Sequence, residues 1–272
     1  MPAHASTRSR LLLVLALVAG GLLDACAGTK GRDAARQGGT LRVVSYNIRH
    51  GCGSDDTVDL ARTAAALRAL APDLVALQEV DCGVRRSGGV DQAAELGRLL
   101  GMHHAFGSFM DYQGGRYGMA FLSRFPILRS HAIRLPPGDE PRIALRIDVA
   151  VPGVGELTAV NVHFNWVGDD TLRYAQARAL AEQLASIGPR YLVLGDFNDE
   201  PGSRTLQLFQ GQALEIAKPA AARLTYPAPA PVKEIDFVFA SPTDGWRVHE
   251  VRAVAETLAS DHRPVLAVIE AR

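Results

Sequence analysis

The sequence lacks a charge imbalance, a zinc-ligand motif and an internal linker. These absences bear on nucleic-acid binding, on zinc chemistry and on the number of domains. Lysine plus arginine and aspartate plus glutamate both total 29, so no global basic field attracts the chain to nucleic acid, although a local basic patch stays open. Only three cysteines and no H-E-x-x-H motif occur, which disfavours a zinc enzyme. No Pro/Ser/Gly-rich stretch divides the interior, so one folded domain is predicted.

The longest apolar run lies near the N-terminus and is too short for a permanent membrane span. Leu11 to Leu23 contains almost no polar atom, yet it is shorter than the roughly 20 residues that span a bilayer. Arginines precede it and small residues follow it, which is the order of a secretion signal. We therefore expect residues 1–26 to be a signal peptide, residues 27–40 a flexible tether and residues 41–272 the domain of an exported protein.

Two processing routes stay open at the end of this run. Leu23-Asp24-Ala25-Cys26 resembles a bacterial lipobox, although Asp24 stands where small or uncharged residues are usual. On that route Cys26 is acylated and anchors the protein to a membrane. Ala25-Cys26-Ala27 also fits a cleavage site that would release a soluble, secreted or periplasmic protein. The lipoprotein is favoured, because a cysteine at this place is otherwise unexplained.

Strand and helix patterns alternate from Leu41 onwards. A strand over 41–48, a helix over 57–70 with Thr57 as its cap, and a strand over 73–80 form a predicted βαβ unit with parallel strands. A helix over 90–101, capped by Gly101, precedes several strand-like runs over 103–164 that must be largely antiparallel. A long amphipathic helix over 169–187 and four further strands follow. The pattern indicates two packed sheets with helices outside them.

Polar side chains stand at the ends of several of these strands, and strand ends of open sheets converge on one crevice. They are Asn47, Gln78, Glu79, His163, Asp196, Asn198, Asp261 and His262. Each alone has a simpler explanation, since Asn47 would more often be a turn residue and Asp196 a cap. Asp236 is harder to explain, because it lies in the apolar strand "EIDFVF" and needs a partner there. His262 could be that partner.

Together these residues predict a metal site for phosphoryl chemistry. Glu79, Asp261 and the Asn47 carbonyl are hard oxygen ligands that suit Mg²⁺, for which Mn²⁺ can substitute. Asp196 can orient a water molecule, while Asn198 and His163 can donate hydrogen bonds to phosphoryl oxygens. His262, held by Asp236, can transfer protons or stabilise negative charge.

The motifs "SYNIRHG", "LQEVD", "YGMAFLSRFPI", "NVHF", "GDFN", "IDFVF" and "SDHRPV" follow one another in this order. In this respect the chain resembles the endonuclease/exonuclease/phosphatase superfamily over Leu41 to about Ile269. The resemblance implies an α/β fold, a four-layer α/β/β/α sandwich of two mixed, mainly antiparallel sheets with helices on both outer faces. It also implies Mg²⁺-dependent phosphoester cleavage, with Glu79 as principal metal ligand and Asp236 with His262 as acid/base dyad. Met119 and "NVHF" depart from common family residues and are expected to reshape substrate contacts.

Loop residues add further predictions. Arg142 could bind a phosphate through two hydrogen bonds, although Arg85, Arg86 and Arg142 could equally be solvated surface charges. Tyr112, Tyr117 and Trp166 could contact a substrate ring or lipid headgroup, unless Tyr117 fills the core.

Cys52 and Cys82 each follow a predicted ligand strand. Because Asn47 and Glu79 should approach one ion, the loops that hold these cysteines should be neighbours, and a disulfide is predicted in the oxidising compartment. The alternative is two small buried thiols.

The preferred interpretation is an exported, membrane-anchored hydrolase, expected to be a monomer, that cleaves a phosphoester as a phosphodiesterase acting on a lipid headgroup or small molecule. An extracytoplasmic deoxyribonuclease is the first alternative, but a chain without a basic run has little to contact many phosphates. A binding module with an inactive site is the second alternative. The complete set of polar residues argues against it.

Overall fold

The computed structural model describes residue 1, residues 39–242 and residues 245–272. The predicted signal peptide, the lipobox with Cys26 and most of the predicted tether lie outside the described residues. Across the part of the chain that is described, no helix combines the length and apolar character needed to cross a bilayer.

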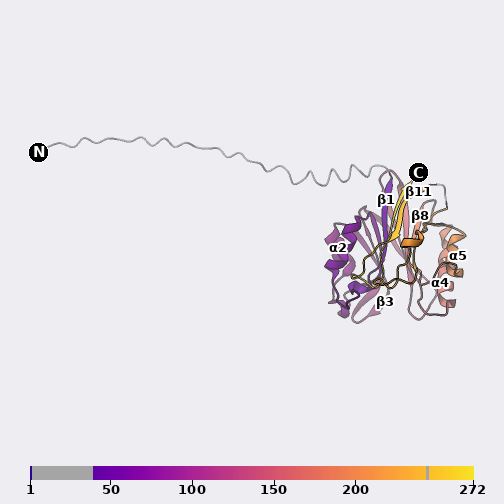
Figure 1. Ribbon diagram of the computed structural model, residues 1–272, viewed down its shortest axis with the longest axis horizontal. Helices are drawn as coiled ribbons and strands as arrows, with labels where there is room; N and C mark the ends of the chain where they lie inside the picture. Colours follow the sequence, from indigo (N-terminus) through magenta and orange to yellow (C-terminus); the bar gives the residue numbers. More distant parts are fainter. Residues whose placement is uncertain (2–38, 243–244) are drawn as a thin grey trace. The chain divides into compact units, whose positions relative to one another are not determined.

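Two sheets of six strands each form the centre of the domain (Figure 1). The first sheet has the order β11 (Trp246–Ala253), β12 (Val265–Ala271), β1 (Thr40–Asn47), β2 (Leu74–Cys82), β4 (Gly115–Ser123), β3 (His103–Tyr112). The second sheet has the order β5 (Ile127–Arg134), β6 (Ile143–Val151), β7 (Gly155–His163), β8 (Tyr191–Asp196), β10 (Asp236–Ala240), β9 (Leu214–Glu215). Only β1/β2 and β7/β8 are parallel among the described pairs. The predicted mixed, mainly antiparallel sheets are confirmed.

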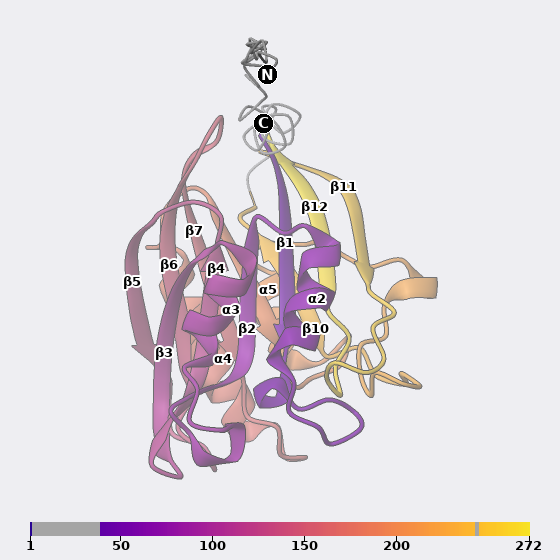
Figure 2. The ribbon, with the colours of Figure 1, turned by 90° about the vertical axis from the view of Figure 1, so that its left-hand side faces the viewer.

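Helices cover the outer face of each sheet. Figure 2 shows α2 (Leu60–Leu70) and α3 (Gln92–Leu100) lying across the first sheet. On the opposite side, α4 (Thr171–Leu184) and α5 (Arg204–Gln210) cover the second sheet (Figure 1). Short 3-10 turns follow β1 (η1, Arg49–Gly51) and β2 (η2, Arg85–Ser87), and a third precedes β10 (η3, Ala220–Ala222). The predicted four-layer sandwich is confirmed.

The apolar pattern of the strands explains these layers. Side chains on alternate faces of a strand point to opposite sides of its sheet. In β10, Val238 faces the core between the sheets, whereas Phe237 and Phe239 face the core beneath α4 and α5. Met119 lies in the core between the sheets with 0% exposure, so the expectation that it reshapes substrate contacts is wrong.

One glycine allows the central strands of the second sheet to pair closely. Gly195 has a φ of +154°, and a Cβ there would meet the Val162 carbonyl oxygen at 2.0 Å. No side chain fits this position, which lies directly before Asp196. The glycine of "GDFN" therefore lets β8 lie close to β7 at the point where its polar end begins.

The first helix begins later than predicted. Asp59, not Thr57, caps α2, and its side chain accepts a hydrogen bond from the Arg62 N–H. Thr57 is held in the preceding loop, where its carbonyl accepts from the Gly53 N–H. Gly101 caps α3 in the left-handed conformation, as predicted.

The predicted disulfide is wrong, because Cys52 and Cys82 are both free. Cys52 is buried, and its backbone forms an isolated antiparallel β-bridge with Val58 of the same loop. Cys82 is still part of β2, where it pairs with Arg116 of β4, the neighbour on the side away from β1. The two strands are adjacent, but the chain turns each cysteine towards a different partner.

Candidate active site

A cavity of about 650 Å³ opens where the central parallel strands of the two sheets end. Most of the predicted site residues line it: Glu79, Arg142, His163, Asp196, Asn198, Asp261 and His262. Asn47 and Asp236 lie behind the lining and hydrogen-bond to residues in it. The predicted convergence of the strand ends is therefore what the fold shows.

Strand register accounts for the convergence. Asn47, the last residue of β1, pairs with Gln78 where the pairing of β1 with β2 ends, and His163 pairs with Asp196 at the end of β7 and β8. Asp236 begins β10 opposite Asp196. Asn47, His163, Asp196 and Asp236 thus stand at the last or first position of a buried strand, where neighbouring strands fix the backbone.

Glu79 is placed by a bulge in β2. The pairing of β2 with β4 shifts between Leu77 and Val80, and Glu79 adopts a φ of +57°. A non-glycine residue in this conformation costs on the order of 1 kcal/mol. The bulge turns the half-buried carboxylate into the cavity.

Asn161 supports this bulge from the opposite sheet. Its fully buried amide nitrogen donates to the carbonyls of Leu77 (2.8 Å) and Ala120 (3.0 Å), and its oxygen accepts from Gln78 Nε2 (2.7 Å). These bonds satisfy polar groups on both sides of the irregular pairing. Sequence reasoning missed Asn161, although alternation in "ELTAVNVHF" places it on the same face as Leu157, Ala159 and His163, which was a signal for it.

Asn47 joins the two halves of the site. Its amide nitrogen donates to Glu79 Oε1 at 3.0 Å and to Asp196 Oδ2 at 3.1 Å. Its carbonyl oxygen, the atom predicted to bind a metal, accepts from the Arg49 N–H at 3.1 Å. A role as metal ligand would require this oxygen to use its second lone pair.

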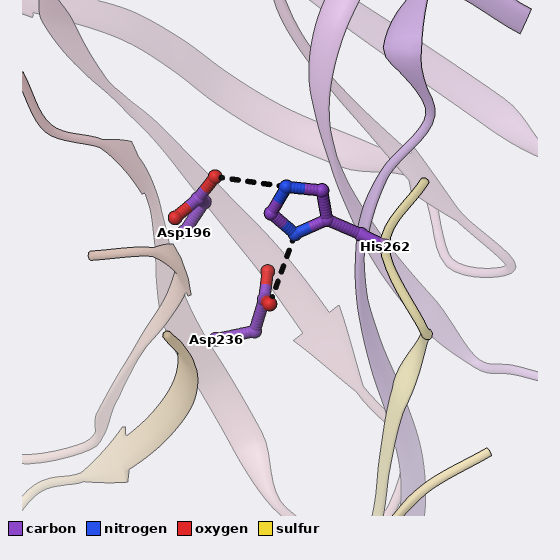
Figure 3. Close-up of side chains that lie close together, drawn as sticks. All are labelled: Asp196, Asp236 and His262. Atoms are coloured by element: carbon purple, nitrogen blue, oxygen red, sulfur yellow. Dashed lines mark hydrogen bonds and ion pairs between the residues drawn. The ribbon is translucent and has the colours of Figure 1, made fainter. Parts of the chain in front are cut away.

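His262 lies between two carboxylates, as Figure 3 shows. Its Nδ1 is 3.1 Å from Asp236 Oδ2, and its Nε2 is 3.7 Å from Asp196 Oδ2. Burial alone would lower the pKa of His262, but the charges of Asp236 and Asp196 outweigh it and raise the pKa to about 10. Burial also raises the pKa of the Asp196 carboxyl. The two carboxylates therefore favour the imidazolium form of His262.

The same three side chains form a possible metal site that the sequence analysis did not predict. Their ligand atoms lie within 4.8 Å of one another, and Asp236 Oδ1 has no hydrogen-bond partner among the described residues. A histidine must be neutral to bind a metal. His262 can therefore either keep its second ring proton or bind a metal ion together with Asp196 and Asp236, but it cannot do both at once.

His163 is held as a neutral hydrogen-bond donor. Arg142 Nη1 is 3.2 Å from His163 Nδ1, and because a guanidinium only donates, Nδ1 must accept. The ring proton then lies on Nε2, 3.6 Å from Asp196 Oδ2. Burial, together with Arg142, lowers the pKa of His163 well below its ordinary value. His163 can therefore donate from Nε2 into the cavity.

Arg142 itself is buried at 4% exposure, so the alternative of a solvated surface charge is wrong for it. Its Nη2 is 2.9 Å from Glu140, its guanidinium lies over the Phe109 ring, and its Nε is unpaired among the described residues. Arg85 is exposed, whereas Arg86 is half-buried and forms two hydrogen bonds to Asp81.

The remaining predicted residues lie at the edges of the cavity. Asn198 has a φ of +51°, and its side chain donates to the Phe164 carbonyl at 3.0 Å. Asp261 is half-exposed and stands 3.9 Å from Arg49 Nε. Sequence reasoning missed several other lining residues, which are Glu140, Arg173, Tyr226 and Lys233.

Four layers, two central parallel pairs and an Asp/His cluster at their ends define the class of phosphoesterase sandwiches. The family model described as Endonuclease/Exonuclease/phosphatase family matches residues 44–262. The chain belongs to this family, and is by family a hydrolase of the phosphoesterase type.

Solved structures agree on the fold. The endonuclease/exonuclease/phosphatase from Bacteroides vulgatus is 23% identical, with a TM-score of 0.70 over 86% of this chain and 99% of that one. The protein of that description from Beutenbergia cavernae is 23% identical, with a TM-score of 0.67 over 85% and 72%. A mannosyl-6-phosphatase from Bacteroides thetaiotaomicron is 20% identical, with a TM-score of 0.69 over 84% and 99%. A search among curated proteins gives no significant match.

Proposed function

We propose that the protein is an exported, membrane-anchored Mg²⁺-dependent hydrolase that cleaves a phosphoester of a lipid headgroup or small molecule. The observation that supports it most is the array of Asp236, His262 and Asp196, buried at the wall of the cavity that Glu79 and Arg142 also line. Burying charges is costly even when they are paired, and clusters of buried titratable groups in a cavity are typical of catalytic sites.

Each residue has a part in this proposal. Arg142 and the Nε2–H of His163 bind the phosphoryl oxygens, and Asp196 orients the attacking water. His262, held by Asp236, stabilises the developing negative charge or protonates the leaving oxygen. Glu79, Asp261 and Asn47 would hold the metal ion, whose chemistry is to neutralise charge on the phosphoryl group.

The charges around the cavity favour a small substrate over nucleic acid. In the part of the chain that the structure describes, three Arg or Lys side chains line it, of which Arg142 is assigned to the reacting phosphate and Arg173 is paired with Asp199. Lys233 is exposed and has no ion pair among the described residues. One such cation cannot follow a chain of phosphates, which needs many.

The proposal is tested by turnover with Mg²⁺ and with a chelator. The substrates are bis-p-nitrophenyl phosphate, sphingomyelin, plasmid DNA and, because of the phosphatase among the similar structures, mannose 6-phosphate. We expect chelator-sensitive turnover of a small or lipid phosphoester, lost in Asp196→Asn and kept in Asp111→Asn, an exposed carboxylate outside the cavity. Preferred cleavage of DNA would replace the substrate class, and no turnover at all would favour a binding module.

Export and anchoring need a separate experiment. Cells that express the full chain and Cys26→Ser are grown with a labelled fatty acid and fractionated. Label and membrane association that depend on Cys26 support the lipoprotein, whereas release of both forms into the soluble extracytoplasmic fraction contradicts it.

A further inference from the structure

One large side chain of the cavity has no part in the proposed chemistry. Trp166 lines the cavity and is 63% exposed. Tryptophan is usually well buried, because exposing an indole keeps a large apolar area in water. The chain's other tryptophan, Trp246, follows this rule, with 7% exposure and a hydrogen bond to Ser241.

The backbone around Trp166 is fixed although its side chain is exposed. Arg173 Nη1 donates to the carbonyl oxygens on both sides of it, those of Asn165 (3.0 Å) and Val167 (2.9 Å). The Asn165 N–H donates to the buried Gln176 at 2.9 Å. Arg173 is itself buried and paired with Asp199. Buried polar groups thus fix the backbone of this turn, and the turn presents the exposed Trp166 indole to the cavity. A rigid backbone that presents one exposed side chain is typical of a preorganised binding contact.

The surroundings restrict what the indole can bind. Tyr226 also lines the cavity, with its ring packed on His262 at 4.9 Å between centroids, so aromatic surface is present at more than one place. Two lining carboxylates, Glu140 and Asp199, are neutralised by their arginines. Beside Trp166 the Arg173 guanidinium is occupied by Asp199 and by the two flanking carbonyls, so a flat and uncharged group suits this side of the cavity better than a second phosphate.

We propose that Trp166 is a specificity-determining residue that packs against the flat face of a ring in the organic part of the substrate, while Arg142 and His163 bind its phosphate. This inference rests on the proposed phosphoesterase function. The ring can be aromatic or a sugar, since both present a flat apolar face to an indole. The substrate class is accordingly a ring-bearing phosphoester.

Turnover of four substrates in four proteins tests the inference. The substrates are phenyl phosphate, mannose 6-phosphate, glycerol 3-phosphate and phosphocholine, or their methyl diesters if only diesters are cleaved. The proteins are wild type, Trp166→Ala, Trp166→Phe and Leu128→Ala, the last removing an exposed apolar side chain outside the cavity. In Trp166→Ala we expect KM for ring-bearing substrates to rise about tenfold with kcat little changed, and ringless substrates to change by about twofold at most.

The other variants and outcomes decide the details. Trp166→Phe should recover most of the loss, and Leu128→Ala should match wild type. The ring-bearing substrate with the larger change identifies an aromatic or a sugar ring. An equal change for all four substrates, no change, or the largest change for phosphocholine would overturn the inference, the last because a quaternary ammonium also binds to indoles.

Binding separates failure of this inference from failure of the proposed function. In Trp246→Phe, Trp166 is the only tryptophan, so its fluorescence reports directly on the cavity. With a chelator present, titration with ring-bearing phosphoesters should change this fluorescence, and glycerol 3-phosphate should not. If wild type hydrolyses nothing but the fluorescence responds, the hydrolase proposal fails and the ring contact stands. If wild type hydrolyses a substrate but the fluorescence does not depend on a ring, the hydrolase proposal stands and the ring contact fails.

Discussion

The two sheets have the same plan but place their polar groups in different surroundings. Each has one parallel pair at its centre, and each pair ends at the cavity. In the first sheet, Glu79 is half-buried and Asp261 is half-exposed. In the second sheet, Asp196 is 1% and Asp236 0% exposed. The site therefore has a wet half, with Glu79 and Asp261, and a dry half, with Asp196, Asp236 and the buried His262, which reaches it from the loop before β12.

The outer cores on the far side of the strands also differ. Beneath α4 and α5, Phe197 packs against four other phenylalanines with centroids 5.2 to 5.6 Å apart. Beneath α2 and α3 the core is largely aliphatic. A dry wall strengthens charge interactions and holds a proton between carboxylates, whereas a wet wall suits a hydrated Mg²⁺ ion. The comparison teaches that one topology can supply both requirements of phosphoryl transfer.

The largest effect should come from the dry half. Asp236→Asn removes the charge that holds the His262 imidazolium, and we expect kcat to fall by about 10²–10⁴-fold. Steady-state kinetics on the best substrate of the panel measures it. Asp111→Asn, which alters an exposed carboxylate, is the matched control. A loss below about threefold would contradict a catalytic dyad.

The second largest effect is expected at Asn161, which forms hydrogen bonds from the second sheet to the first. Asn161→Ala removes the hydrogen bonds to the carbonyls of Leu77 and Ala120 and the shortest of the bonds that the Gln78 amide donates, and the free energy of unfolding should fall by about 3 kcal/mol. Urea unfolding measures this loss. Gln183→Ala, an exposed amide on α4, should cost less than about 0.5 kcal/mol. Equal losses in both variants would show that the Asn161 bonds do not support the bulge.

The pH dependence of stability should follow the dry half. The folded protein raises the pKa of His262 from 6.5 to about 10, so the bound proton stabilises the fold fully below pH 6.5. This stability is lost as pH rises through about 10. The raised pKa of Asp196 acts in the same direction but at lower pH, between its ordinary value of 3.8 and about 7. In Asp236→Asn the decline on the alkaline side should be smaller by on the order of 2 kcal/mol; unfolding curves from pH 6 to 10 that run parallel in the two proteins would contradict it.

The smallest effect should come from the wet half. In Glu79→Gln one ligand charge is lost while the shape is kept, and the Mg²⁺ concentration for half-maximal turnover should rise by about tenfold. Titration of activity with Mg²⁺ measures the shift, and calorimetric binding without substrate is an independent readout. If Asp236→Asn shifted the Mg²⁺ titration while Glu79→Gln did not, the ion would belong to the dry half, at the cluster of Asp196, Asp236 and His262.

The sequence predicted the layers and the convergence of the strand ends because both depend on local patterns. Alternation in β10 already separated Asp236 from Phe237 and Phe239. What it could not predict depends on contacts between distant segments. The burial of Arg142 arises from Glu140, His163 and Phe109 together.

Other errors arise from backbone pairing within a loop and between neighbouring strands. The cap of α2 moved from Thr57 to Asp59 because the loop before it pairs with itself at Cys52 and Val58. That same pairing, and the pairing of Cys82 with β4, prevented the disulfide. The bulge at Glu79 could not be foreseen either, since no turn residue marks it.

Asn47 couples the geometry of the site to the packing of the two sheets. Its single amide nitrogen donates hydrogen bonds to Glu79 of one sheet and to Asp196 of the other. The sheets therefore cannot shift relative to each other without breaking one of these bonds and separating the two carboxylates. Mild denaturant that loosens the sandwich should then silence the enzyme while its helices and strands are still intact.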